Sequence, residues 1–211
     1  MIAYVARTAY GNARTRALRR GLLGPSVADR IRESPTPARR AGALRSHGVE
    51  ASNAAEAWSA LLARLVAAAA TLSRAYPVGG ELLRDLARLH ELENLKLALR
   101  ALARRAPLDR CTALWRPLGP LAQLSREACL GVASAQELAD TLQRTSYADL
   151  RPLLSRPESE LLIDRWGSLR IVAQARALPA RERDAGELAL MLVRERDLEA
   201  LSRAPEFALS P

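Results

Sequence analysis

The stretch HELENLKLALRALARR, residues 90–105, decides the fold. Its leucines at positions 92, 95, 99 and 102 recur at steps of three and four residues, which is the spacing of one apolar face of an α-helix. A charged stripe runs beside this face and is formed by Glu93, Lys96, Arg100 and Arg104. The pattern therefore predicts a buried helix with a charged flank.

Composition extends the helical prediction to the rest of the chain. The protein has 211 residues, of which 49% are hydrophobic, 26% charged and 4% aromatic. Most of the hydrophobic residues are alanine and leucine, which favour helix, whereas the aromatic and β-branched residues typical of strands are few. This balance argues against global disorder, and the length allows a sizeable core. We therefore predict an all-α protein built from repeated helical modules.

The periodicity places individual helices. After an opening helix within residues 4–23 and a loop-rich interval at 33–53, helices are expected over 54–75, 81–105, 135–144 and 187–203. A short helix is expected over 148–154, and a further buried helix in the stretch that follows Pro157, residues 158–178. Capping boxes begin two of them, at Asn53 with Glu56 and at Ser134 with Glu137. The residues expected to face the core include Trp58, Leu65, Leu161, Leu169, Leu188, Met191, Leu192, Leu198 and Leu201, with Trp166 at the centre of its helix.

We predict that the chain divides near Pro117, Gly119 and Pro120, where helix-breaking residues gather. This division gives residues 1–113 as the first helical module or modules and residues 114–211 as the second. Both parts follow one plan of helix, break, amphipathic helix and a terminal helix rich in leucine and mixed charge. We interpret this as an internal repeat.

The net charge of +9 is concentrated at the N-terminus. Residues 1–50 hold ten arginines and three acidic residues, a balance of +7, whereas the remaining residues carry 22 basic and 20 acidic groups, a balance of +2. The arginines are either solvated helix charges or a contact patch for an acidic partner. A GC-rich source genome is an alternative explanation of the arginine content, because arginine codons are GC-rich. A nucleic-acid-associated helical module stays open as an alternative.

Catalytic and metal-binding motifs are absent from the sequence. His47 and His90 belong to no recognisable catalytic set, and no glycine-rich phosphate loop occurs. Cys111 and Cys129 have no CxxC spacing, so buried free thiols are favoured over a metal site. We expect no catalytic residue, no metal and no cofactor. We also expect neither a signal peptide nor a membrane span, since the most apolar segment, residues 61–72, is short and contains Arg64.

Several short motifs follow one another along the chain. They are Asn12–Leu18 (NARTRAL), Glu91–Lys96 (ELENLK) with Arg100, Ser134–Leu138 (SAQEL), Leu142–Tyr147 (LQRTSY) and Ile163–Trp166 (IDRW). The residues of these motifs and the order of the motifs resemble those of the C-type subunit of the V-type and A-type rotary ATPases, whose eukaryotic form is known as the d-type subunit. A last copy at residues 194–201 keeps Asp197 and Leu198 but has Ala200 in place of the expected asparagine. The chain is shorter than is usual in that family, around residues 31–53 and 155–185.

The resemblance implies a mechanical role without catalysis. A protein of this kind sits on the cytoplasmic mouth of the membrane rotor ring and receives the central shaft, so that ATP turnover and H⁺ or Na⁺ transport stay coupled. Its partners are the shaft and the ring, it touches the membrane only through the ring, and no nucleic acid or cofactor is expected. The rival interpretation is a helical-repeat interaction or regulatory module. A third is a relative that kept the fold and lost the rotor role.

The candidate residues are structural or partner-contact residues, namely Asn12, Arg14, Arg16, Glu91, Asn94, Lys96, Arg100, Tyr147, Asp164 and Arg165. Asn94 needs hydrogen-bond partners in a leucine-rich helix, so we expect it to tie this helix to a nearby loop, with Glu91 close enough to share its partner. Lys96 and Arg100 either meet acidic groups of a partner or pair with Glu93. Tyr147 is expected in a half-buried turn, with a partner contact as the alternative.

Overall fold

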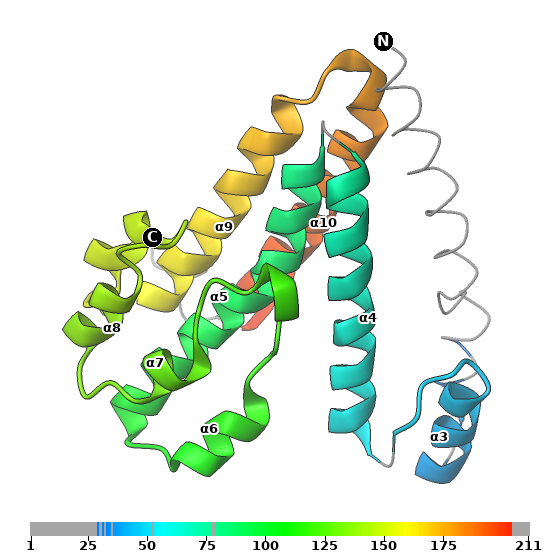
Figure 1. Ribbon diagram of the computed structural model, residues 1–211, viewed down its shortest axis with the longest axis horizontal. Helices are drawn as coiled ribbons and strands as arrows, with labels where there is room; N and C mark the ends of the chain where they lie inside the picture. The colour runs from blue at the N-terminus through cyan, green and yellow to red at the C-terminus, as the bar shows by residue number, and fades with distance from the viewer. Residues whose placement is uncertain are drawn as a thin grey trace.

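The structure, a computed structural model, describes residues 29, 31, 33, 34, 36–51, 53–76 and 79–203. Every regular element in this part of the chain is an α-helix or a short 3₁₀ helix (Figure 1). The all-α prediction is therefore confirmed. The opening helix expected within residues 4–23 lies outside the described residues, and so do Asn12, Arg14 and Arg16.

The N-terminal side of the described chain contains α3 (Pro37–Arg45) and α4 (Ala54–Ala75). Helix α3 begins after Thr36, whose hydroxyl accepts a hydrogen bond from the backbone N–H of Arg39. Asn53 caps α4 as predicted, because its Oδ1 accepts from the Glu56 N–H at 2.9 Å, and its Nδ2 donates to the Glu56 carboxylate at 3.1 Å. Short α3 fits the loop-rich interval expected there.

Helix α5 (Gly80–Arg104) runs back along α4 after a glycine turn (Figure 1). Gly79 has a φ of 80°, a conformation that residues with a Cβ rarely adopt. A Cβ on Gly80 would collide with the carbonyl oxygen of Ser73 near the end of α4. The two glycines therefore allow a tight reversal and a close approach of the two helices.

Short elements wrap around the C-terminal half of α5. They are α6 (Leu108–Leu114), η1 (Gly119–Leu121), α7 (Arg126–Leu130), α8 (Ala135–Thr141) and η2 (Ala148–Leu153). Ser134 caps α8 by accepting the Glu137 N–H at 3.2 Å, as the second capping box predicts. Helix α8 ends at Thr141, three residues earlier than expected, and the helix expected over 148–154 is the 3₁₀ helix η2 with Pro152 inside it.

The C-terminal helices α9 (Ser159–Arg176) and α10 (Arg183–Arg203) form an antiparallel pair joined through η3 (Ala180–Glu182). Helix α9 packs on the side of α5 away from α4 (Figure 1). A Cβ on Gly186 would lie 2.9 Å from the Ala175 carbonyl oxygen, so the glycine lets α10 approach the backbone of α9.

Helix α5 lies at the centre of the core, as its leucine spacing predicts. Leu92 and Leu95 are at most 2% exposed and belong to a cluster with residues of α7, α8, η2 and α9. Ala87 joins a second cluster with α4 and η1, and Leu82 joins a third with α9 and α10. The first cluster combines residues from both sides of the boundary at 113 and 114. The division into two modules stays a prediction.

Two expectations for the core on α4 are wrong. Trp58 and Leu65 are both 49% exposed. The Trp58 ring lies at the surface, edge-on to His90 at 6.0 Å and under the Arg116 guanidinium at 5.7 Å. Trp58 therefore packs against polar neighbours, while the smaller Leu62 and Val66 face the core.

The expected inner faces of α9 and α10 are also wrong. Leu161 and Leu169 are exposed on α9, and Leu188, Met191 and Leu192 are exposed on α10. Helix α10, which begins at Arg183 rather than 187, instead packs through Gly186, Ala189 and Val193, with Leu190 partly buried beside them, because its close approach to α9 at Gly186 favours small side chains there. The side chains of Leu198 and Leu201 lie outside the description.

Candidate functional site

The side chain of Asn94 ties α5 to the segment between α6 and η1. It is 1% exposed. Its Oδ1 accepts from the backbone N–H of Arg116 at 2.8 Å, and its Nδ2 donates to the Arg116 carbonyl at 2.7 Å. An asparagine amide matches a backbone amide in this way because it carries one acceptor and one donor group side by side. These two hydrogen bonds connect α5 to a nearby loop, which is the role that we expected of Asn94.

The carboxylate of Glu91, one turn before Asn94, gathers three donors. It is also 1% exposed. Its Oε1 accepts from the backbone N–H groups of Gln123 at 2.6 Å and Leu124 at 2.7 Å, and its Oε2 accepts from the Tyr147 hydroxyl at 2.5 Å. One side chain of α5 thus holds both the start of the α7 region and the start of η2. Glu91 and Asn94 bind neighbouring but different loops, so the partner that we expected them to share is not found.

Burial governs the ionisation of Glu91 and of its hydrogen-bond partner Tyr147. Removal from water raises the pKa of Glu91 above its ordinary value, although its hydrogen bonds with Tyr147, Leu124 and Gln123 act in the opposite direction. Burial, followed by the nearby charge of Glu91, also raises the pKa of Tyr147. Tyr147 therefore keeps its proton and acts as a donor.

Tyr147 is more deeply placed than predicted. Its side chain is 1% exposed rather than half-buried, because its ring fills the core cluster beside Trp166. The two rings meet edge-on, with centroids 5.8 Å apart. The hydroxyl is already bonded to Glu91, so the geometry favours the structural role for this residue.

Two ion pairs join α5 to α9. The Lys96 ammonium lies 2.8 and 2.9 Å from the two oxygens of Asp164 and 2.7 Å from Glu93. The Arg100 guanidinium binds Glu160, with Nε 2.8 Å from Oε1. The helices are antiparallel, so the four-residue step on one matches the four-residue step on the other. These contacts raise the pKa of Arg100, chiefly through its hydrogen bond to Glu160.

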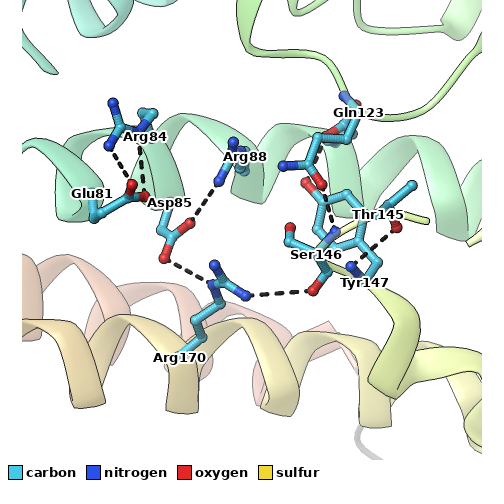
Figure 2. Close-up of polar contacts among 10 residues, drawn as sticks. Glu81, Arg84, Asp85, Arg88, Gln123, Thr145, Ser146, Tyr147 and Arg170 are labelled. Atoms are coloured by element: carbon cyan, nitrogen blue, oxygen red, sulfur yellow. Dashed lines mark hydrogen bonds and ion pairs between the residues drawn. The ribbon is translucent and has the colours of Figure 1, made fainter. Parts of the chain in front are cut away.

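A third α5–α9 connection is one that the sequence patterns do not single out (Figure 2). Asp85, 4% exposed, accepts from Arg170 at 2.8 Å and from Arg88 at 3.3 Å. Arg170 stacks over Trp166 and also donates to the Ser146 carbonyl at 3.4 Å. The sequence does contain one signal for this connection: Asp85 lies among the leucines 82, 86 and 89 of an apolar helix face. A carboxylate buried on such a face needs charged or hydrogen-bonding partners.

Gln123 completes the polar connections around the Tyr147 turn (Figure 2). Its backbone N–H binds Glu91, and its side-chain Oε1 accepts from the Ser146 N–H at 2.7 Å. The Thr145 hydroxyl accepts from the Tyr147 N–H at 3.1 Å. The segment before α7 and the turn before η2 are therefore fastened to each other as well as to α5.

The structure brings together six of the predicted residues, namely Glu91, Asn94, Lys96, Arg100, Tyr147 and Asp164, along one helix and the elements packed against it. Arg165 differs from them. It is exposed on α9, and its side chain has no hydrogen-bond or ion-pair partner among the described residues. Asn12, Arg14 and Arg16 lie outside the described part of the chain.

The polar groups of this region are engaged in holding the fold. Among the described residues, no group of three or more His, Cys, Asp or Glu side chains could hold a metal ion. Cys111 and Cys129 are buried free thiols, as predicted, and burial raises the pKa of Cys129 to about 11. No helix within the described ranges is long and apolar enough to cross a membrane.

Fold and polar contacts together define an all-α protein whose long central helix is fastened by buried polar side chains to the segments around it. A family model described as the ATP synthase (C/AC39) subunit matches residues 11–164, well over half of the chain. The chain belongs to this family, whose members are non-catalytic central-stalk subunits of V- and A-type ATPases. Searches of curated proteins and of solved structures gave no significant match.

Proposed function

We propose that this chain is a non-catalytic coupling subunit of the central rotor of a V/A-type ATPase. It joins the central shaft to the membrane rotor ring on the cytoplasmic side, peripheral to the membrane, and keeps ATP turnover coupled to H⁺ or Na⁺ transport. The observation that carries the proposal is the family match over residues 11–164, which includes all of α5 and its ELENLK motif.

The buried contacts of α5 supply the stiffness that such a role requires. A coupling subunit transmits torque, so its helices must resist sliding past one another. Sliding of α5 would leave the acceptors of Glu91 and Asn94 and the donors of two loops without partners. Each buried group left unsatisfied costs about 1–3 kcal/mol. Sliding along α9 would in addition separate the buried Lys96 ammonium from Asp164.

The same contacts support a choice among the candidate partner-contact residues. Lys96 and Arg100 already bind carboxylates of this chain. We therefore propose that an acidic partner binds other basic residues. Arg165 is exposed on α9, and the arginine-rich N-terminal segment supplies Arg14 and Arg16. We propose these three residues as contacts to the shaft or the ring.

Affinity purification from native membranes tests the proposal. The chain carries a C-terminal tag, and the membranes are solubilised in a mild detergent that preserves rotary complexes. We expect shaft, ring and catalytic-head subunits of one rotary ATPase to be recovered with it. In parallel, a tagged shaft subunit shows that the complex survives solubilisation. Recovery of the ATPase through the shaft without this chain would contradict the proposal.

A further inference from the structure

A groove of about 340 Å³ opens among the C-terminal end of α5, α6 and α7. Its deepest lining residues are small and at most 3% exposed, namely Ala98, Cys111 and Cys129. Partly buried aliphatic side chains continue the lining, namely Leu102, Leu130 and Val132. This volume is in the range of sites that enclose a ligand group, roughly 300–1,000 Å³. The lining therefore suits a compact apolar side chain.

One arginine lines the edge, or rim, of the groove, and two more are sequence neighbours of its lining residues. Arg105 and Leu108 line it, and Leu108 is 57% exposed. Arg104 and Arg110 are exposed in the same segment, where Asp109 is the one acidic residue, so residues 104–110 carry a balance of +2. None of the three arginine side chains has a hydrogen-bond or ion-pair partner within the described part of the chain. By contrast, the nearby Arg126 of α7 pairs with its neighbour, Glu127.

The backbone of Arg105 singles out this rim. Arg105 has φ 48° and ψ 44°, and it is the one non-glycine residue with positive φ among the described residues. Glycine or asparagine is preferred at the end of a helix in this conformation, because a Cβ is crowded there. Strained residues of this kind gather at binding sites. An arginine in a position that suits glycine indicates that its side chain serves something other than the fold.

We propose that this groove binds an acidic polypeptide segment of a partner protein. The segment inserts an apolar side chain among α5, α6 and α7, while its carboxylates meet Arg104, Arg105 and Arg110. The lining contains no aromatic side chain on which a nucleobase could stack, so the groove favours a polypeptide over single-stranded nucleic acid. Arginine suits this partner because its planar guanidinium binds a carboxylate through two parallel hydrogen bonds.

The proposal stands on the groove and its rim, and it does not depend on the rotor role. The chain could bind an acidic segment in this groove within any complex. If the membrane purification fails, the proposal for the groove is unaffected. If the peptide does not bind, the proposal of a rotor role is unaffected.

Fluorescence anisotropy with the full chain tests the groove. The probe is a labelled hexapeptide with two leucines between two pairs of glutamates. One control peptide replaces the leucines with serines, and the other replaces the glutamates with lysines. We expect saturable binding of the probe and at least about tenfold weaker binding of each control. Binding of the probe should also weaken as salt is raised, because exposed ion pairs are screened.

Matched variants locate the binding. Ala133→Trp places a large ring at an exposed lining position, and we expect it to weaken binding about tenfold or more. Arg105→Gly removes one rim charge at a position whose backbone suits glycine, so the fold is retained while binding weakens about fivefold. Arg176→Ala removes the same charge from an exposed position at the far end of α9 and should leave binding unchanged (Figure 1). Circular dichroism confirms folding of each variant.

Three results would overturn the proposal. The first is a serine control that binds as tightly as the leucine probe. The second is a folded Ala133→Trp variant that binds the probe as the parent chain does. The third is binding to phosphatidylserine vesicles that depends on Arg105 while the peptide does not bind, since this would assign the rim to a lipid surface.

Discussion

Glu91→Ala is the substitution that should damage the protein most, because it removes the acceptor shared by three donors. Gln123 and Leu124 each lose the partner of a backbone N–H, and Tyr147 loses the partner of its hydroxyl. The side chain of Glu91 is 1% exposed, so water reaches these donors poorly. Both loops held by Glu91 would be loosened together.

The magnitude follows from two opposing effects. A buried donor left without an acceptor costs about 2 kcal/mol, so three of them cost about 6 kcal/mol. Removing the carboxylate also removes its own desolvation cost, the effect that raises the pKa of Glu91, and this offsets roughly half of the loss. We expect a net loss of about 3 kcal/mol in the free energy of unfolding. At this chain length that corresponds to a fall in Tm of about 9 °C.

Urea denaturation followed by circular dichroism at the helical band measures this loss. The matched control is Glu187→Ala, which removes the same side chain from an exposed position of α10 and should change the free energy of unfolding by less than about 0.5 kcal/mol. A loss for Glu91→Ala within about 1 kcal/mol of the control would refute the reasoning, because the three donors would then be satisfied without this carboxylate.

Four further predictions test other features of the structure. Asn94→Ala should cost about 2–3 kcal/mol, because both backbone groups of its loop partner lose their hydrogen bonds; thermal denaturation measures it. Lys96→Met should cost about 3 kcal/mol in urea denaturation by removing the buried cation that binds Asp164 and Glu93, and adding Asp164→Leu should restore part of the loss, whereas an additive double variant would contradict the pairing. Burial raises the pKa of Glu91 above 4.5, so between pH 4.5 and the raised pKa the folded protein binds more protons than the unfolded chain. The free energy of unfolding of the parent chain should therefore fall as pH rises through this window, and Glu91→Gln, measured by urea denaturation at each pH, should lack that slope. Arg105→Gly should raise Tm, because glycine relieves a left-handed backbone strain of about 1 kcal/mol; an unchanged or lower Tm would contradict this.

Sequence patterns predict well those features that depend on neighbours in the chain. The apolar spacing of α5 and the side-chain caps at Asn53 and Ser134 act within a few residues, and the structure contains all of them. The tie expected of Asn94 is also largely local, because an amide on a leucine face needs partners wherever the helix lies. Its partner, a backbone 22 residues away, could not be read from the pattern.

Contacts between distant segments are where sequence patterns fall short. Both Lys96 and Asp164 are visible as charged helix residues, but their pairing depends on the antiparallel register of α5 and α9. On α10, the positions of the large apolar residues predict the wrong buried face. The close approach of the backbones at Gly186 favours small side chains at the interface, and Met191 is exposed. The size of the side chains at a helix–helix interface depends on the distance between the two backbones. The sequence pattern of one helix carries no information about that distance.

Ion transport in native membrane vesicles tests the coupling role most directly. Vesicles from cells that lack this chain are compared with vesicles from the same cells expressing it, and ATP hydrolysis and ATP-driven H⁺ or Na⁺ uptake are measured on the same preparations. We predict that hydrolysis by the catalytic head persists without the chain while ion uptake is lost, and that expression of the chain restores uptake. Uptake per ATP hydrolysed that is equal with and without the chain would contradict the coupling role.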